Sequence, residues 1–367
     1  MRKKLTKNIE WSILICTILL VIIGLIALFS ATRNAEYDEF KKQIMWIGIS
    51  IPFIIAFTLI DYKTIAKTSI VMYVIMLVLL VAVLFTKEIN GATSWFSFGA
   101  FSIQPAEFAK IFVIIFMAFV MSKMTDKGKK EISRPTRLLL LLVLIGMPVL
   151  LIVKQPDYGT ALAFLVSFIL MLFVAGIDKR YIIAGILTLV IALPLLYFFV
   201  LPDHAKTRID VFLNQDLDPR GAGYNLTQSK LAIGAGQVFG MGLLKGNQTQ
   251  LGYLSPKTTD FIFSVIGEES GFILAGAIII IYVILITKAM FVAKTAKDSL
   301  GSYIAIGIAG VFLFHMTENI GMTIGLLPIT GVPLPFVSYG GSSLISNLIM
   351  VALLLNISGR RQKAIFN

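Results

Sequence analysis

Long apolar segments dominate this chain and constrain its fold more than any other feature. Ten of them approach the roughly 20 residues that cross the hydrocarbon core of a bilayer as a helix. Lipid offers backbone groups no hydrogen-bonding partner, so such segments are expected to be helical. We predict an all-α integral membrane protein, a bundle of ten transmembrane helices. Their expected positions are 11–30, 42–60, 67–86, 107–122, 138–153, 159–176, 181–201, 260–287, 301–325 and 341–357.

Composition supports this class and excludes several others. Hydrophobic residues make up 57% of the chain and charged residues 14%, against about 25% charged residues in soluble proteins. The single Cys16 excludes an internal disulfide framework, and two distant histidines, His204 and His315, exclude a His-based zinc site. No break in composition divides the chain, so residues 1–367 are expected to form one polytopic membrane domain.

The positions of the basic residues predict the orientation. Lys and Arg are concentrated before the first helix and in the alternate segments 61–67, 123–137, 179–180, 288–297 and 360–363. The short segments of opposite parity hold few. Such a bias marks the cytoplasmic side of a membrane protein and not a DNA-binding surface. Both termini are therefore expected in the cytoplasm, and the large loop 202–258 between helices 7 and 8 is expected outside.

This outer loop is rich in glycine between Arg220 and Gly252. One interpretation is a flexible linker. Interleaved apolar residues and the helical stretch 225–233 favour a segment that packs on the bundle or re-enters its rim.

The stretch Leu251–Phe272 carries the most informative charges. A polar turn leads to Asp260, and Glu268 and Glu269 follow about two turns later in an apolar segment. Ionisable groups within a bilayer are costly and usually functional. Asp260 also fits a helix N-cap, and Glu269 fits a residue that braces a neighbouring loop.

Two further pairs of ionisable residues lie within predicted spans. Glu107 and Lys110 are three residues apart and share a helix face, as do His315 and Glu318. Either pair also fits a structural role. The cytoplasmic halves of the helices carry no charge apart from their ends. A proton- or ion-coupled transporter would need polar groups through the whole membrane, so this pattern favours a site at the outer leaflet.

Two outer turns are longer or more polar than simple helix connections require. Lys154-Gln-Pro-Asp157-Tyr-Gly-Thr160 joins helices 5 and 6, and residues 328–343 join helices 9 and 10. Both are expected to line a cavity.

These segments resemble the SEDS family (shape, elongation, division and sporulation proteins). The matching motifs are Gln104-Pro-Ala-Glu107 with Lys110, Gln155-Pro-Asp157-Tyr-Gly-Thr160, Gly223-Tyr-Asn-Leu-Thr-Gln228-Ser229, Thr259-Asp260-Phe-Ile-Phe263 with Glu268-Glu269-Ser-Gly271, and Pro333-Leu-Pro-Phe-Val-Ser338-Tyr-Gly-Gly-Ser342. They extend over essentially the whole chain. The elongation branch (RodA) is most similar and the division branch (FtsW) is next. Gly236-Gln237 departs from the family's usual Gly-Gly.

The resemblance implies a peptidoglycan glycosyltransferase of the bacterial cytoplasmic membrane that polymerises lipid II on the outer face during cell elongation and rod-shape maintenance. The family's essential Asp falls on Asp260. The implied partners are a class B penicillin-binding protein, which is a transpeptidase, and other membrane proteins of the elongation complex. No nucleic acid is expected.

On this basis Asp260 is expected to act as the base that deprotonates a sugar hydroxyl. We expect the substrate-binding residues to be Glu107, Lys110, Lys154, Asp157, Lys257, Gln228 and Ser338, with Lys110 the first choice for the leaving pyrophosphate. A divalent cation, Mg²⁺ or Mn²⁺, is compatible with Asp260, Asp157 and Glu268 as ligands. The competing hypotheses are a lipid II flippase, the division paralogue with the same chemistry, and a lipid-linked polysaccharide ligase.

Overall fold

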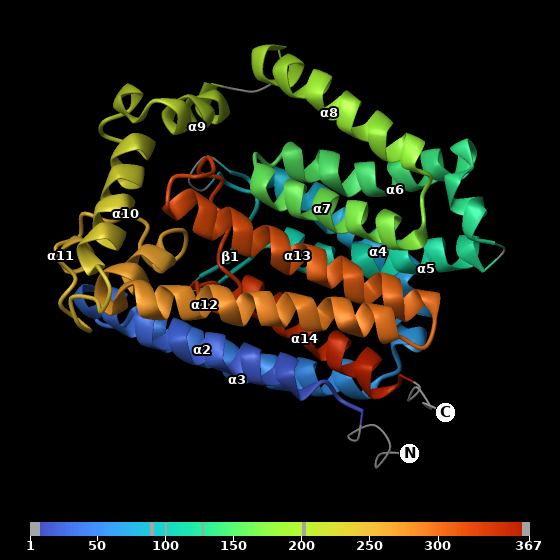
Figure 1. Ribbon diagram of the computed structural model, residues 1–367, viewed down its shortest axis with the longest axis horizontal. Helices are drawn as coiled ribbons and strands as arrows, with labels where there is room; N and C mark the ends of the chain where they lie inside the picture. Colours follow the sequence, from blue (N-terminus) through green and yellow to red (C-terminus); the bar gives the residue numbers. More distant parts are fainter. Residues whose placement is uncertain (1–7, 89–91, 100, 127, 200–202, 362–367) are drawn as a thin grey trace.

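The computed structural model describes residues 8–88, 92–99, 101–126, 128–199 and 203–361. The basic residues before Asn8 and residues 200–202, at the boundary between the seventh predicted helix and the outer loop, therefore lie outside the described residues. Within these ranges the protein is built from long helices (Figure 1). They are α2 (Trp11–Ala31), α3 (Asp38–Leu59), α4 (Tyr62–Ala82), α5 (Pro105–Thr125), α6 (Pro135–Val153), α7 (Tyr158–Ala175), α8 (Lys179–Phe199), α12 (Ile262–Thr295), α13 (Ser299–Thr323) and α14 (Gly341–Gly359).

Each predicted span coincides with one of these helices. Among the described residues, nine helices, α8 not included, are long and apolar enough to be candidate membrane spans. The elements between them are shorter. They are η1 (Arg33–Ala35), η2 (Val83–Phe85), η3 (Lys129–Ser133), α9 (Asp203–Leu213), η4 (Gln215–Leu217), α10 (Ala222–Gly236) and α11 (Asn247–Gln250).

A small β-hairpin interrupts the helical secondary structure of the described residues. Strand β1 (Phe96–Phe98) pairs antiparallel with β2 (Phe101–Ile103), with Phe96 opposite Ile103. No strand was predicted between the expected helices 67–86 and 107–122. Two short runs of alternating aromatic and hydroxyl residues around Gly99 explain the hairpin, since Gly99 takes the positive φ of a tight turn.

Local signals fix where several helices begin. The Asp61, Asp157 and Asp298 side chains accept hydrogen bonds from the backbone N–H groups of the first turns of α4, α7 and α13. Helices α5 and α6 begin with Pro105 and Pro135, and proline is favoured at the first helical position because its missing N–H leaves no bond unmade.

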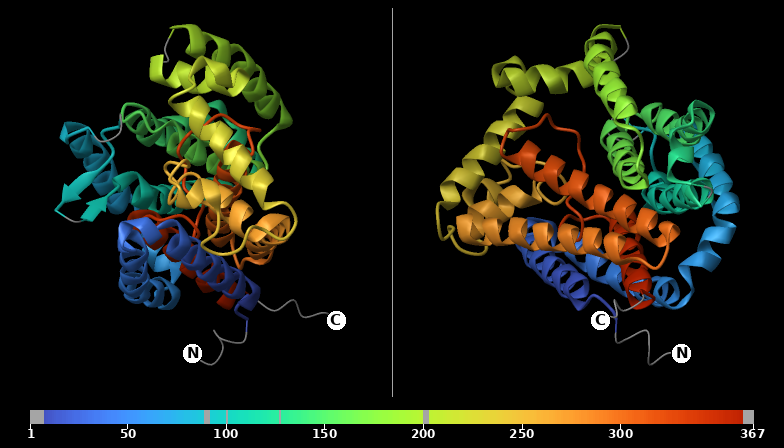
Figure 2. Two further views of the ribbon diagram at one scale, coloured as in Figure 1. Left: turned by 90° about the vertical axis from the view of Figure 1, so that its left-hand side faces the viewer. Right: turned by 45° about the vertical axis from the view of Figure 1, so that its right-hand side comes forward.

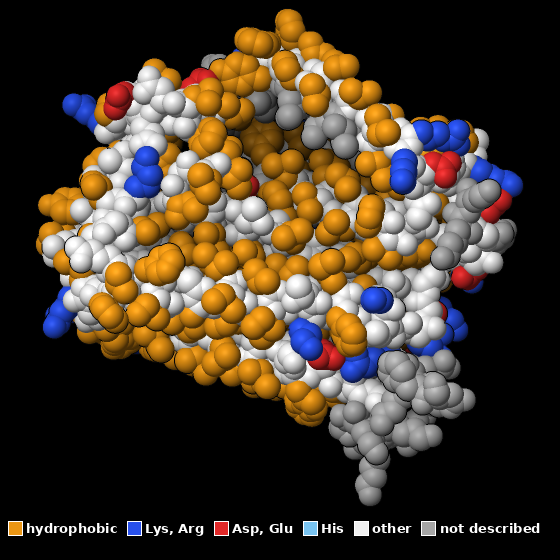
Figure 3. All heavy atoms as spheres, in the orientation of Figure 1, with side chains coloured by type: hydrophobic (Ala, Val, Ile, Leu, Met, Phe, Trp, Pro, Cys, Tyr) orange, Lys and Arg blue, Asp and Glu red, His pale blue; other side chains and the backbone are white. Residues whose placement is uncertain are grey.

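Helix α14 lies at the centre of the bundle. Nearly all its side chains are buried, and it packs against α3, α5 and α13. Helices α2 and α3 cover one side, whereas α8 and α9 lie along the opposite side in every view (Figure 2). Figure 3 shows a hollow beneath α8 that is walled by hydrophobic side chains.

Successive long helices run antiparallel, so the connecting segments gather at two ends (Figure 1). One end holds both described chain ends, where the Asn8 side-chain amide donates to the Arg361 carbonyl at 3.3 Å. The other end, called the loop end below, holds residues 86–88, 92–99, 101–105, 153–158, 203–262 and 323–341.

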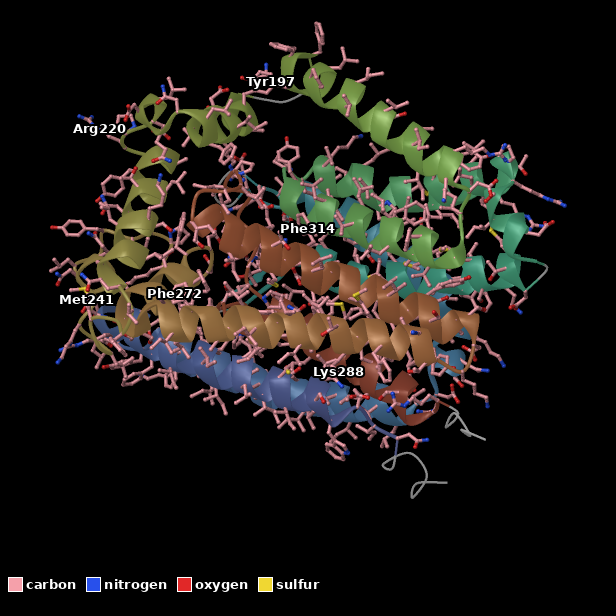
Figure 4. The ribbon with its side chains drawn as sticks, viewed as in Figure 1. Tyr197, Arg220, Met241, Phe272, Lys288 and Phe314 are labelled. Carbon is pink, nitrogen blue, oxygen red and sulfur yellow. The ribbon has the colours of Figure 1, made fainter. Side chains whose placement is uncertain are left out.

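At the loop end, the glycine-rich segment packs tightly on α12. A Cβ at Gly236 of α10 would lie 1.8 Å from the Gly267 carbonyl oxygen, so only glycine permits this approach. The backbone N–H of Met241 donates to the carbonyl of Glu268 at 2.9 Å. Met241 and Phe272 lie at the same end of α12 in Figure 4. The packed interpretation of this loop is therefore confirmed and the flexible linker is wrong.

The same packing gives Glu268 and Glu269 polar partners. Glu268 accepts from the backbone N–H of Gln248 at 2.7 Å and from the Thr249 hydroxyl at 2.6 Å, and Glu269 accepts from the Ser30 hydroxyl at 2.6 Å. Helix α12 is interrupted at Gly271, whose φ is +71°. Glu269 also accepts from the Gln250 side-chain amide at 3.0 Å, so both acids brace the segment 237–250. The bracing role predicted as one alternative for Glu269 is confirmed.

The segment between α13 and α14 folds back into the bundle. Phe336 and Val337 are buried, and the Tyr282 hydroxyl donates to the Pro335 carbonyl. A Cβ at Gly24 of α2 would lie 2.7 Å from the Val337 Cα. Residues 324–340 are therefore an inserted loop that packs between α2, α12 and α13. This loop positions the site described next.

Candidate active site

Asp260 lies two residues before α12 and is half-buried against the inserted loop. Asn319 of α13 donates from Nδ2 to the carbonyl oxygens of Asp260 at 3.0 Å and Val332 at 2.8 Å. The Ser338 hydroxyl donates to the Thr259 carbonyl at 2.6 Å. A Cβ at Gly331 would lie 3.4 Å from Asp260 Oδ2, so the carboxylate faces the loop's Gly331. The backbone of Asp260 is thus held from two sides.

The carboxylate of Asp260 does not cap α12. The N-cap position is Phe261, and no side chain caps the first turn. The N-cap interpretation of Asp260 is therefore wrong. Burial raises the pKa of Asp260, while a hydrogen bond from Thr259 and the positive charge of Arg208 lower it, with burial the largest effect. A carboxylate whose pKa is raised is a stronger base than a carboxylate with the ordinary pKa of an exposed aspartate.

Arg208 was not singled out from the sequence. It lies on α9, is half-buried, and donates from Nη1 to the Thr330 carbonyl at 3.2 Å. Thr330 in turn donates to Glu318 at 2.8 Å. The sequence shows Arg208 as a basic residue shortly after the seventh apolar segment. Its spacing does not indicate that it lies near Asp260. The inserted loop brings the two charges together.

A second polar cluster is enclosed between α5, α13 and α14. Lys110 Nζ lies 2.9 Å from Glu107 Oε1 and 3.0 Å from His315 Nε2, and all three side chains are buried. The Ser346 hydroxyl donates to the other oxygen of Glu107 at 2.8 Å. The predicted pairing of Glu107 with Lys110 is confirmed. His315 and Glu318 share a helix face but have different partners: His315 contacts Lys110, and Glu318 contacts Thr330.

The protonation of His315 follows from its two contacts. Lys110 can only donate, so His315 Nε2 accepts and Nδ1 carries the proton that is donated to the Pro333 carbonyl at 3.1 Å. Asn319 lies one helical turn further along α13 and binds Val332. Residues 332 and 333 therefore connect the Lys110 cluster to the backbone of Asp260.

Asp157 adjoins the same cluster. Its side chain caps α7 through the Thr160 N–H at 3.1 Å, and its second oxygen accepts from Gln104 Nε2 at 2.7 Å. Gln104 immediately precedes α5, three residues before Glu107. Burial raises the pKa of Asp157, while its hydrogen bonds with Thr160 lower it. The motifs at 104–110 and 155–160 thus meet at one place.

The remaining predicted site residues lie elsewhere or have other partners. Lys154 is exposed at the end of α6, and Lys257 donates from Nζ to the Thr249 carbonyl at 2.8 Å. Burial lowers the pKa of Lys257. Gln228 is half-buried on α10, where the neighbouring Ser229 makes the buried bonds to α12 and α13. The Ser338 hydroxyl links the inserted loop to the Thr259 carbonyl. None of the described hydrogen bonds joins these four side chains to the Asp260 carboxylate.

The proposed metal ligands do not form a shared site. The described residues contain no group of three His, Cys, Asp or Glu side chains able to hold a metal ion. Both carboxylate oxygens of Glu268 accept hydrogen bonds from Gln248 and Thr249. Asp157 is bound to Gln104 and Thr160. Among the described residues, the three candidate acids Asp260, Asp157 and Glu268 therefore do not form one cation ligand set.

Comparison with known proteins gives matches over nearly the whole chain. A family model described as cell cycle protein, for FtsW, RodA and SpoVE, matches residues 10–363. A probable peptidoglycan glycosyltransferase FtsW of Trichlorobacter lovleyi is 36% identical over 358 residues, which cover 94% of this chain and 92% of that protein. The peptidoglycan glycosyltransferase RodA of Treponema pallidum is 30% identical, covering 98% of this chain and all of that protein.

The fold also has a solved counterpart. A chain from a peptidoglycan synthase complex, studied for the coordination of polymerization and crosslinking, superposes with a TM-score of 0.82. It is 26% identical and covers 95% of this chain, with 97% of its own length matched.

Proposed function

The chain belongs to the FtsW, RodA and SpoVE family of cell cycle proteins, and we propose that it is a peptidoglycan glycosyltransferase that polymerises lipid II. The observation that carries this proposal is the half-buried Asp260, which is held by Asn319 and the inserted loop and lies near Arg208. Full-length relatives that are named as peptidoglycan glycosyltransferases support the same activity.

In the proposed reaction, Asp260 removes the proton from the sugar 4-hydroxyl of an acceptor lipid II. The hydroxyl oxygen then bonds to the anomeric carbon of a lipid-linked donor chain, and undecaprenyl pyrophosphate leaves. A positioned base contributes roughly 10²–10⁴-fold to such a step. Burial, which raises the pKa of Asp260, strengthens it as a base.

Arg208 is the group best placed to stabilise the charge of the leaving pyrophosphate. Its guanidinium lies close enough to lower the pKa of Asp260, and it presents several donors to phosphate oxygens. Lys110 was the first expectation for this role. Its ammonium is enclosed by Glu107 and His315. We therefore assign Lys110, with Glu107 and Asp157, to holding the walls of the site through His315 and the inserted loop.

The hollow beneath α8 suits the isoprenoid tails of the substrate. Its walls are hydrophobic (Figure 3), and α8 exposes apolar side chains that include Leu187, Val190 and Leu195. Helix α9 follows α8 and carries Arg208. A lipid lying beneath α8 would therefore bring its pyrophosphate toward Asp260.

We further propose that the protein is a multi-pass protein of the bacterial cytoplasmic membrane with ten spans, α8 among them, and with both termini in the cytoplasm. The loop end, the large loop between α8 and α12, and the site then face outward. The partner would be a class B penicillin-binding protein, since the matching solved chain belongs to a complex that polymerises and crosslinks. The role in elongation rests on the sequence resemblance, because the named relatives include both FtsW and RodA.

The proposal is tested by incubating the purified full-length protein with purified lipid II in detergent. Glycan polymer is the expected product. Detergent micelles have no leaflets, so a pure flippase would leave lipid II unchanged. Unchanged lipid II, both alone and with the penicillin-binding protein added, would contradict the proposal.

A further inference from the structure

At the end of the bundle away from the candidate active site, a cavity of about 310 Å³ opens between α5 and α6. It is lined by Phe119, Val120, Lys123, Met124 and Arg137. Three of these side chains are apolar and two are cationic. We propose that this cavity binds the headgroup of an anionic phospholipid, with phosphatidylglycerol as the representative ligand.

The charges around the cavity leave a positive excess. Glu131 is the neighbouring acid, and its two oxygens are shared between Arg134 at 2.6 Å and Arg137 at 2.7 Å. Asp126 instead accepts from the Ser299 hydroxyl of α13 at 3.4 Å. Lys123 forms no described ion pair and lies with its Nζ 5.6 Å from the centre of the Phe119 ring. Among the described side chains here, the cations Lys123, Arg134 and Arg137 therefore exceed the two acids by one charge.

An unused hydrogen-bond donor points to a missing acceptor. Arg137 binds Glu131 through Nη2, while its Nη1 is buried and has no partner among the described residues. Leaving a buried donor without an acceptor is unfavourable, because the group has lost its hydrogen bonds to water. Arginine presents its donors in a planar fork that matches phosphate oxygens. A phosphate in the cavity would lie near the Lys123 ammonium, and a small shift of the Arg137 side chain would open the buried Nη1 to it.

The surroundings favour a lipid over a free anion. Leu140 lies one turn along α6 from Arg137, and both Leu139 and Leu140 are exposed. The cationic site therefore borders an apolar helix face on which acyl chains can lie. Basic pockets between helices on the cytoplasmic side are a known means of binding anionic headgroups. The volume lies at the lower limit for ligand pockets and suits a phosphoglycerol group.

The inference is independent of the proposed chemistry and rests only on the proposed membrane orientation, which puts the cavity at the cytoplasmic leaflet. The test is native mass spectrometry of the full-length protein with increasing phosphatidylglycerol or phosphatidylcholine. We expect a phosphatidylglycerol adduct at lower lipid concentration than any phosphatidylcholine adduct. Each of Lys123→Gln and Arg137→Gln should weaken the first adduct about fivefold, because a basic residue near the headgroups is worth roughly 1 kcal/mol.

The matched control is Lys297→Gln, which removes one exposed charge from the loop between α12 and α13 at the same end of the bundle. It should bind phosphatidylglycerol like the wild type. Because Arg137→Gln also breaks the bond to Glu131, Lys123→Gln is the decisive variant. Equal adducts for Lys123→Gln and the wild type would overturn the proposal, as would an equal loss in Lys297→Gln. Displacement of the lipid by millimolar inorganic phosphate would instead identify a free-anion site and also overturn it.

Discussion

Asp260 differs from the neighbouring acids in how its carboxylate is used. Glu268 accepts three hydrogen bonds from Gln248 and Thr249, and Glu107 is bound by Lys110 and Ser346. Among the described contacts, the Asp260 carboxylate accepts a hydrogen bond from Thr259 only. A base must keep an oxygen available for the incoming proton. Among these acids, Asp260 meets that requirement best.

The substitution Arg208→Gln tests the effect of Arg208 on Asp260 through the pH dependence of polymerisation. Arg208 lowers the pKa of Asp260, so its removal should raise that pKa further. The base acts only when deprotonated, and activity is lost as the pH falls through its pKa. The acidic limb of the polymerisation profile should therefore move to higher pH in Arg208→Gln. Lys206→Gln on the same helix is the control, and an unshifted limb in Arg208→Gln would remove the proposed coupling.

Individual partners were the least predictable part of the site. Spacing alone predicted that Glu107 and Lys110 meet, because residues three apart share a helix face. It gave no means to foresee that Arg208 approaches Asp260 or that Glu268 binds residues 248 and 249. Both depend on segments that fold back over the bundle, and such long-range contacts leave no local pattern.

Among the elements, α10 shows how glycine sets a helix interface. Gly236 meets the Gly267 carbonyl at the crossing of α10 and α12, whereas a Cβ at Gly234 would meet no atom within 4 Å. The next residue, Gln237, has a φ of +47°, a conformation that favours glycine and agrees with the family's Gly-Gly at this place. The crossing therefore requires its glycine for steric reasons.

Gly236→Ala should accordingly push α10 from α12 and destabilise the loop end by about 1–3 kcal/mol, as overpacking typically does. Gly234→Ala is the matched control. It should be neutral or stabilising by up to about 1 kcal/mol, because alanine is the better helix former. Thermal unfolding of the detergent-purified variants measures both. Equal melting temperatures for the two variants would show that the crossing tolerates a side chain.

Helices were the most predictable elements, since each apolar run of spanning length became one. Their ends were less certain: α12 continues to Thr295, beyond the predicted residue 287, and its last turns bury Ala289, Val292 and Ala293. The β-hairpin at 96–103 was missed because each strand has only three residues.

At the scale of the whole molecule, the two ends of the bundle are chemically different. The loop end carries Asp260, Arg208 and the inserted loop. The opposite end joins the two chain ends through Glu10, which contacts both Lys288 and Arg361 at 3.1 Å. By the positive-inside rule, the loop end is expected to face outward.

This orientation is measurable by cysteine labelling. Cys16 is the chain's only cysteine, so Cys16→Ala gives a background without thiols. In intact cells, a membrane-impermeant maleimide should label Asp216→Cys on the outer segment and leave Lys297→Cys unlabelled until lysis. The reverse pattern would place the candidate active site in the cytoplasm and contradict the proposed function.

The most direct test of the proposed chemistry is lipid II polymerisation by purified Asp260→Asn. Replacing the carboxylate by an amide of the same shape removes the base and preserves the Asn319 contact to the backbone carbonyl. Polymer formation should fall about 10²–10⁴-fold, with the thermal stability unchanged, while the exposed Asp216→Asn retains wild-type activity. Polymer from Asp260→Asn at the wild-type rate would contradict the assignment of Asp260 as the base.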